Sequence, residues 1–143
     1  MKRSLASRLN SATVHVGRAL RAGPDAYGLA AEQRSALGVV VFAGPIRMGA
    51  LAEAERVGAP AMTRTVEILE RAGLVRRKPD GADGRALLVE RTAKGAEAVR
   101  KGRDDRVRRI DAALRAMPAD SRVRLAAAVG DLERLIAVLE SRD

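Results

Sequence analysis

No cysteine occurs in this chain, and histidine, tyrosine and phenylalanine occur once each. Without cysteine, the protein has no disulfide framework, no thiol switch and no cysteine-ligated metal. This composition suits a reducing cytoplasm, where we expect the protein to work. The single histidine, His15, cannot build a site that needs several imidazoles, and a lone histidine beside an apolar helix face is more often packed or solvated. We therefore expect no metal and no cofactor.

A long apolar run is also missing. The N-terminal residues MKRSLASRLNSATV are basic, but Asn10, Ser11 and Thr13 interrupt them. They therefore lack the continuous apolar core that a signal peptide needs. No other apolar run is long enough to cross a bilayer. We expect a protein that is neither exported by a signal peptide nor inserted in a membrane.

Signatures of catalysis are scarce. The chain has no phosphate loop of the kind GxxxxGK followed by Ser or Thr, and no pair of carboxylates stands out. We therefore expect a protein that is not an enzyme. With 143 residues, of which 47% are hydrophobic and 31% charged, the chain has the size and composition of one ordinary globular domain with its own core.

Positive charge is in excess. The 27 Lys and Arg residues against 18 Asp and Glu residues give a formal charge of +9. Such an excess favours a polyanionic partner, because each neutralised phosphate releases counterions. Charge alone is weak support, since arginine can simply be the solvating cation. Its location strengthens the case, because five cations surround one predicted hairpin and only Asp80 and Asp83 oppose them there. These cations are Arg71, Arg76, Arg77, Lys78 and Arg85.

Residues 58–95 predict a helix, a hairpin with a polar tip and the start of another helix. Gly73 stops the helix as a left-handed cap would. Residues 74–78 and 86–91 can then pair around the turn-rich PDGADG tip. A helix followed by a basic hairpin is the outline of a winged helix-turn-helix. The apolar side of the helix is formed at helical spacing by Met62, Val66 and Leu69.

Three further helices are predicted before this stretch. The first spans residues 4–22 and has an apolar side, and Gly23-Pro24-Asp25 ends it because proline bars continuation. The second spans residues 30–43 and is buried. The third, residues 50–57, is the first helix of the helix-turn-helix. Side chains expected to face inward are Leu37, Val40, Val41 and Phe42 in the second helix, and Leu51 and Ala52 in the third.

Two helices are predicted after the hairpin, over residues 92–117 and 119–141, with Pro118 between them. The middle of the first, RKGRDDRVRR, is strongly charged. We interpret it as a solvated helix, and a second nucleic-acid surface is the alternative. The last helix has a wide apolar face. Together with the helix over residues 4–22, these apolar faces exceed what a small lobe can cover, so we expect an obligate symmetric dimer with interleaved terminal helices.

The hairpin resembles the wing of the multiple antibiotic resistance regulator (MarR) family of bacterial transcription factors. The similarity is carried by Arg77-Lys78-Pro79-Asp80-Gly81-Ala82-Asp83-Gly84-Arg85 and by the Thr92-Ala93-Lys94-Gly95 run that follows. It implies a single MarR-like domain over residues 1–143, mainly α with a small β wing. The resemblance places a winged helix-turn-helix DNA-binding lobe at 29–95, helical dimerisation regions at 4–22 and 96–141, and a third strand at 46–48.

The resemblance also implies how the dimer would read double-stranded DNA. Two copies of the helix over residues 59–72 would enter successive major grooves of a pseudo-palindromic operator. Arg64 is the candidate for a base-edge contact. Glu67 either accepts a hydrogen bond from a cytosine amine or pairs with Arg64 or Arg71, and we favour the pairing. Shorter-range contacts with DNA are expected from Pro60, Ala61 and Thr63.

The wing would reach the flanking minor groove. Arg85 would lie there in the negative potential of a narrow A·T tract, and Arg77 and Lys78 would add further DNA contacts. Asp83 is better suited to orient an arginine than to touch DNA, because a free carboxylate is repelled by phosphates. We expect Arg77 to be the arginine that Asp83 orients. Thr92 is expected to cap the following helix.

Members of this family are often regulated by a small anionic or aromatic effector bound between the dimerisation helices and the winged lobe. Such an effector would shift the spacing of the recognition helices through different affinities for two states. A stacking cage is not expected here, because Tyr27 and Phe42 are the only aromatic residues. His15 and Arg18 are the candidates to meet a carboxylate.

Three functions fit the sequence. The leading one is a homodimeric, sequence-specific transcriptional regulator, and the resemblance implies a repressor more often than an activator. The second is a basic, weakly selective DNA-organising protein. The third is a winged-helix protein-interaction module that does not bind DNA. A regulator should prefer its own operator over random DNA by about 10³-fold or more at physiological salt, which separates the first function from the second.

Overall fold

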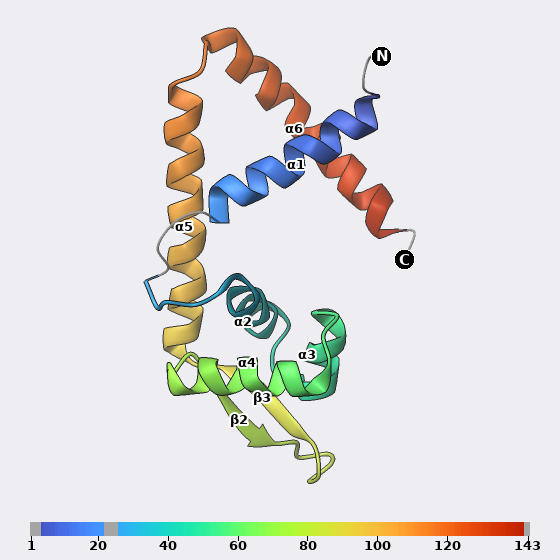
Figure 1. Ribbon diagram of the computed structural model, residues 1–143, viewed down its shortest axis with the longest axis vertical. Coiled ribbons are helices and arrows are strands. Elements are labelled where there is room, and N and C mark those ends of the chain that lie inside the picture. Colours follow the sequence, from blue (N-terminus) through green and yellow to red (C-terminus); the bar gives the residue numbers. More distant parts are fainter. Residues whose placement is uncertain (1–3, 22–25, 142–143) are drawn as a thin grey trace. The chain divides into compact units, whose positions relative to one another are not determined.

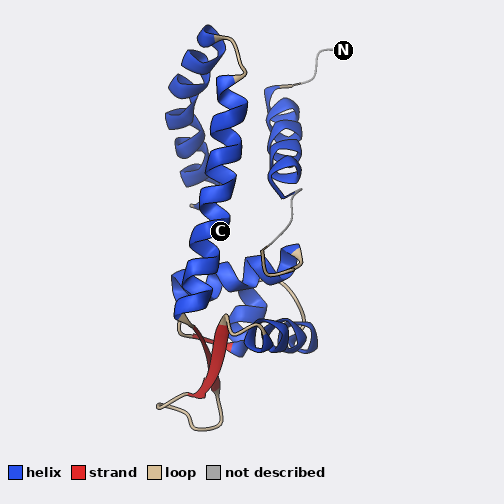
Figure 2. Cartoon of the chain, turned by 90° about the vertical axis from the view of Figure 1, so that its left-hand side faces the viewer, coloured by secondary structure: helices blue, strands red, loops and turns tan. Residues whose placement is uncertain are grey.

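The computed structural model describes residues 4–21 and 26–141, which are mostly helical with one small sheet, as predicted (Figures 1 and 2). These residues fall into two compact units, with the boundary between Asp105 and Arg106. The elements are α1 (Leu5–Arg21), α2 (Ala31–Ala43), β1 (Ile46–Arg47), α3 (Met48–Ala54), α4 (Ala59–Arg71), β2 (Val75–Pro79), β3 (Leu87–Arg91), α5 (Ala93–Arg115) and α6 (Ala119–Glu140).

The three strands form one antiparallel sheet in the order β1-β3-β2. The predicted hairpin is β2 and β3, in which Arg77 lies opposite Val89. The predicted third strand is also present, because Ile46 pairs with Val89 on the other edge of β3. Met48 already belongs to α3, so this strand has only two residues. The sheet thus joins the start of the helix-turn-helix to the hairpin.

The core of the first unit lies between α2, α3, α4 and the sheet. It contains Leu37, Val40, Leu51 and Ala52 as predicted, and Val41 is partly buried against it. The prediction for Phe42 was wrong, since its side chain is 81% exposed. Two residues beyond Val40 on an α-helix is a rotation of about 200°, which places a side chain on the opposite face. Further core residues are Leu29, Ala36, Met62, Val66, Leu69, Leu74, Val75 and Val89.

The end of α4 shows how the sequence turns from helix to hairpin. Gly73 has a φ of +73°, the left-handed conformation predicted for it. Its N–H donates to the carbonyl oxygen of Glu70 at 2.9 Å, and the N–H of Leu74 donates to that of Leu69 at 2.9 Å. This pair of bonds is a Schellman cap, and it is closed by the burial of both leucines. The cap fixes where β2 leaves α4.

The start of α5 is anchored to this same turn. Thr92 caps the helix as predicted, because its Oγ1 accepts a hydrogen bond from Gly95 N at 3.0 Å. The Thr92 hydroxyl in turn donates to the carbonyl oxygen of Gly73 at 2.7 Å. Lys94 Nζ donates to the carbonyl oxygen of Ala72 at 2.6 Å and lies 5.5 Å from the centre of the Tyr27 ring. The hairpin is therefore held at both of its ends.

Three helices carry apolar side chains that stay exposed in the single chain. In α1, Leu5, Val14 and Val16 are exposed. In α5, Val107 and Ile110 are exposed. The large apolar side chains of α6 are between 40% and 69% exposed, and they are Val123, Leu125, Val129, Leu132, Leu135, Ile136, Val138 and Leu139.

The bounds of these helices agree with the predicted ones to within one or two residues at each end. The predicted helix over 4–22 is α1, and the Ser4 hydroxyl accepts a hydrogen bond from Ser7 N at 3.2 Å near its start. Ala22 and the predicted stop at Gly23-Pro24-Asp25 lie outside the described residues. Over residues 4–21 and 26–141, no helix is both long and apolar enough to cross a membrane.

Candidate nucleic-acid interface

The outer face of α4 is polar and accessible. Met62, Val66 and Leu69 are buried, so the residues between them turn outward. Arg64 is exposed, and among the described residues its guanidinium has no hydrogen bond or ion pair with the chain. Of the other predicted contact residues, Pro60 and Ala61 are exposed, and Thr63 and Glu67 are partly exposed. All five therefore lie on one accessible stretch of helix.

Two of these side chains also interact within α4. The Thr63 hydroxyl donates to the carbonyl oxygen of Ala59 at 2.9 Å, which leaves its oxygen free to accept a further hydrogen bond. Glu67 Oε2 lies 3.9 Å from Arg71 Nη2, one helical turn away. This geometry agrees with the pairing we favoured for Glu67. An exposed ion pair of this length is weak, so the carboxylate can change partners at little cost.

Arg77 pairs with Glu70 of α4, so the prediction that Asp83 orients it was wrong. The Nε and Nη2 atoms of Arg77 donate to Glu70 Oε2 at 2.9 and 2.7 Å, and the backbone N–H of Arg77 donates to Glu70 Oε1 at 3.2 Å. The guanidinium holds the pKa of Glu70 below its usual range, and the carboxylate raises the pKa of Arg77. This ion pair joins the recognition helix directly to the first strand of the wing.

Asp83 instead shapes the wing tip. Its Oδ1 accepts a hydrogen bond from the backbone N–H of Arg85 at 3.1 Å, two residues further along. An aspartate readily makes this local bond because its side chain is short. The carboxylate is therefore engaged at the tip and does not turn toward Arg77. Arg85 is exposed, and within the described residues its guanidinium has no partner in the chain.

A second charge cluster lies on the sheet. Glu90 of β3 is buried and is directly opposite Arg76 of β2. Its carboxylate forms ion pairs with Arg76 and Lys78, which lower the pKa of Glu90, Lys78 having the larger effect. Lys78, a predicted DNA contact, is thus partly neutralised. Arg76 and Lys78 stand two residues apart on one strand face, so strand alternation could have revealed this cluster from the sequence.

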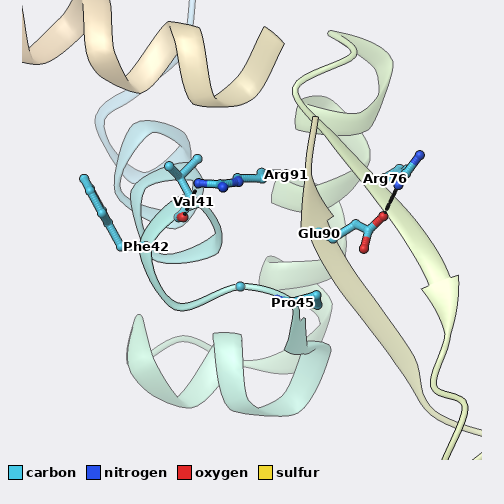
Figure 3. A pocket seen from close by; sticks show the side chains of 7 residues that line it. Val41, Phe42, Pro45, Arg76, Glu90 and Arg91 are labelled. Atoms are coloured by element: carbon cyan, nitrogen blue, oxygen red, sulfur yellow. Dashed lines mark hydrogen bonds and ion pairs between the residues drawn. The ribbon is translucent and has the colours of Figure 1, made fainter. Parts of the chain in front are cut away.

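An open hollow of about 390 Å³ lies beside this cluster, between the end of α2 and the sheet. Figure 3 shows the side chains that line it. Arg91 reaches across it from β3 and donates through Nη1 to the carbonyl oxygen of Val41 at 3.2 Å. The remaining lining residues are Phe42, Gly44, Pro45, Arg76 and Glu90. Within the described ranges, no group of three or more histidine, aspartate or glutamate side chains is arranged to hold a metal ion.

The candidate effector residues His15 and Arg18 are both exposed on α1. They lie one turn apart on the helix, at a spacing that puts them on the same side. Their role in binding a carboxylate stays a prediction.

Replacing Glu70 with glutamine should loosen the joint between α4 and β2. A carboxylate whose pKa is lowered by folding stabilises the fold above its unfolded pKa, and this stabilisation is lost as the pH falls through its folded pKa. Because both partners are about one-third exposed, we expect Glu70→Gln to lower the free energy of unfolding by at most about 1 kcal/mol at pH 7. The difference between the two proteins should shrink as the pH is lowered toward 3.

Urea unfolding of both proteins at several pH values between 7 and 3 measures this effect. Glu67→Gln is a matched control, because its ion pair is longer and more exposed. A Glu70→Gln deficit that stays constant down to pH 3 would mean that the charge of Glu70 does not stabilise the joint.

Comparisons with known proteins agree with this geometry. The sequence profile of the MarR family matches residues 27–86. The HTH-type transcriptional regulator ML2140 of Mycobacterium leprae is 36% identical over 118 residues, which cover 82% of each chain. The transcriptional regulator Tm0710 of Thermotoga maritima has the same fold, with a TM-score of 0.80 and 25% identity over 94% of this chain and 95% of that one.

A third similar protein has been solved with DNA. A mutant of Staphylococcus aureus MepR, bound to an oligodeoxyribonucleotide, matches 96% of this chain and 99% of its own with a TM-score of 0.69. At 16% identity this likeness concerns the fold alone. The family itself is shown by two other matches. The profile covers the helix-turn-helix, and the relative from M. leprae covers most of the chain. The protein therefore belongs to the MarR family of winged helix-turn-helix transcriptional regulators.

Proposed function

We propose that this regulator works as a homodimer that binds a pseudo-palindromic operator in double-stranded DNA and represses transcription in the cytoplasm. In each subunit, α4 enters the major groove and the β2–β3 wing reaches the flanking minor groove. The observation that carries this proposal is that the guanidiniums of Arg64 on α4 and Arg85 at the wing tip are exposed and have no partner among residues 4–21 and 26–141. The oligonucleotide bound by the MepR mutant, which has the same fold, supports it.

The ion pairs within the lobe sharpen the assignment. Arg77 is bound to Glu70, and Arg76 and Lys78 share Glu90. These cations still add positive potential near DNA, but their side chains are already engaged. Arg64 and Arg85 can approach DNA without breaking a bond to any residue that the structure describes, so they contribute most to its recognition.

Dimerisation supplies the two-fold symmetry of the operator. The exposed apolar side chains of α1, α5 and α6 form a larger apolar surface than a monomeric protein usually exposes to water. In our proposal a second copy of the chain covers this surface. In a dimer, two recognition helices contact half-sites about one turn of the double helix apart.

Replacing Leu132 of α6 with glutamate should separate the subunits. Burial of a carboxylate in an apolar interface is costly, so we expect the Leu132→Glu protein to elute as a monomer at micromolar concentration, where the unchanged protein is a dimer. Size-exclusion chromatography with light scattering measures both masses. Glu133→Gln, at the neighbouring exposed position, serves as the control and should stay dimeric. An unchanged protein that is monomeric at this concentration contradicts the homodimer.

Selection of bound sequences from a random DNA library tests the whole proposal at once. We expect an inverted repeat with half-site centres about 10 base pairs apart and A·T-rich flanks. Affinity for the selected site should exceed that for random DNA by about 10³-fold or more at physiological salt. Comparable affinity for both would instead favour a weakly selective DNA-organising protein, and no binding at all would favour a protein-interaction module.

A small anionic or aromatic effector would release the operator by favouring a different spacing of the two recognition helices. His15 and Arg18 are the residues proposed to meet its carboxylate. Their exposure in α1 is compatible with this role.

A further inference from the structure

We infer that Asp80 is a positioning residue for DNA binding, which acts through Arg47 to hold the wing turn that carries Arg85. Asp80 itself does not contact DNA in this scheme. The inference rests on the proposed function, because it assigns a role to Asp80 only through the minor-groove contact of Arg85.

The contacts of Asp80 reach two separate parts of the lobe. Its Oδ2 accepts a hydrogen bond from Nε of Arg47 at 2.8 Å and lies 2.6 Å from Nη2 of the same guanidinium in an ion pair. Its Oδ1 accepts a hydrogen bond from the backbone N–H of Ala82 at 3.0 Å. The Asp80 side chain is only 12% exposed, although it stands at the base of a surface turn. Both carboxylate oxygens therefore accept hydrogen bonds, Oδ1 from a residue within the turn and Oδ2 from a residue of β1.

Arg47 is well placed to act as a fixed anchor. It belongs to β1, where it pairs with Leu88 of β3, and it immediately precedes α3, the first helix of the helix-turn-helix. The Arg47–Asp80 ion pair thus links the base of the wing turn to the element that begins the DNA-binding helices. Because β3 lies between β1 and β2 in the sheet, this side-chain contact links β1 to the residue that follows β2, although β1 and β2 share no backbone ladder.

A short chain of hydrogen bonds carries this constraint to Arg85. The backbone N–H of Asp80 donates to the carbonyl oxygen of Ala86, and the N–H of Ala86 donates to that of Asp83, both at 2.9 Å. Asp83 Oδ1 in turn accepts the N–H of Arg85. Residues 81–85 are all exposed, so these bonds and the Asp80 carboxylate hold the turn without help from the core.

The charge of Asp80 makes this role distinguishable from simple electrostatics. The hydrogen bond from Ala82 and the guanidinium of Arg47 lower the pKa of Asp80, so the carboxylate is charged at neutral pH. A negative charge near phosphates opposes binding, and its removal alone would tighten binding to any DNA. A positioning role predicts the reverse for the operator, because a mobile turn must be ordered when Arg85 enters the minor groove.

The test compares Asp80→Asn with the unchanged full-length protein. Asparagine can still accept the hydrogen bond from Ala82, but it loses the charged pairing with Arg47. We expect affinity for the selected operator to fall about five- to twentyfold. Affinity for a random duplex should be unchanged or higher. In an Arg85→Ala background, Asp80→Asn should no longer weaken operator binding.

Several results would overturn the inference. They are an unchanged operator affinity, an equal loss on operator and random DNA, or a full effect of Asp80→Asn when Arg85 is already alanine. A substitution of Leu132 or Arg47 cannot replace Asp80→Asn in this comparison with Arg85→Ala. A change at Leu132 alters the dimer interface, and a change at Arg47 removes a cation.

A measurement on the free protein separates this inference from the proposed function. Backbone ¹⁵N order parameters for residues 81–85 should be those of an ordered turn in the unchanged protein and should fall toward the flexible range, below about 0.6, in Asp80→Asn. Equal order parameters for residues 81–85 in the unchanged protein and in Asp80→Asn overturn the inference, even when the unchanged protein binds its operator. Absence of any preferred DNA sequence in the unchanged protein overturns the proposed function, and with it the DNA-binding role of Asp80, whatever the turn does.

Discussion

The double variant Arg64→Ala/Arg85→Ala is expected to lose about 30- to 10⁴-fold in affinity for the selected operator and to remain a dimer. A specific arginine contact is worth about 1–3 kcal/mol, and the two residues contact different grooves, so their losses should add approximately. Neither guanidinium is bound within the described chain, which means that the substitutions remove no internal ion pair. Fluorescence anisotropy with labelled operator measures the affinities.

A charge-matched variant controls for this experiment. Arg124→Ala/Arg134→Ala also removes two exposed cations, and both of these lie on α6, in ion pairs with Asp120 and Asp131. We expect it to lower operator affinity much less, through the general field alone. The single variants divide the effect further: Arg64→Ala should relax the sequence preference within the half-site, and Arg85→Ala should remove the preference for A·T flanks. Equal losses of operator affinity in the two double variants would mean that Arg64 and Arg85 act only through net charge and not through specific contacts.

Gly95→Ala is expected to destabilise the winged lobe by about 2–3 kcal/mol. Gly95 is buried in the first turn of α5, where an added Cβ would lie 2.0 Å from the carbonyl oxygen of Leu74 and 3.4 Å from Leu37 Cδ1. That carbonyl oxygen already accepts hydrogen bonds from the backbone N–H and the hydroxyl of Thr92, each at 3.1 Å. The backbone at Leu74 therefore cannot move away without breaking these hydrogen bonds to Thr92.

The same substitution at Gly38 provides the control. Gly38 lies within α2, and an added Cβ there would have nothing within 4 Å. Alanine favours a helix interior over glycine, so Gly38→Ala should stabilise the lobe by up to about 1 kcal/mol. Urea unfolding followed by circular dichroism compares the two variants, at one fixed protein concentration because a dimer's stability depends on it. Equal effects at both positions would show that the contact with Leu74 is not tight.

The sequence predicted most of the fold because local rules agree along the chain. Helical spacing located the buried side of α4, and Gly73 marked its end because only a left-handed residue continues into the hairpin there. Thr92 indicated the start of α5 by the usual preference for a capping hydroxyl. Phe42 was misplaced because a hydrophobic residue near the end of a buried helix was counted inward without regard to its angle around the axis.

The ion pairs of the interface were less predictable. Asp83 and Arg77 are close in sequence and have opposite charges, yet the turn directs Asp83 back to the N–H of Arg85. Glu70 reaches Arg77 only because the Schellman cap folds β2 back toward α4, and its spacing of seven residues shows no simple pattern. Arg47 and Asp80 are 33 residues apart, so their contact depends on the order of strands in the sheet.

The strand order also bears on the tendency of the sheet edges to aggregate. With β3 in the centre, β2 is an edge strand whose outer backbone groups could recruit strands from other molecules, although the N–H of Arg77 already donates to Glu70. This edge carries Arg76, Arg77 and Lys78 in succession and ends in Pro79, which has no N–H to donate. These three cations pair with only Glu70 and Glu90, so two approaching copies would still bring together strands with a net positive charge. The opposite edge, β1, is only two residues long. The cationic strand thus discourages polymerisation through sheet edges.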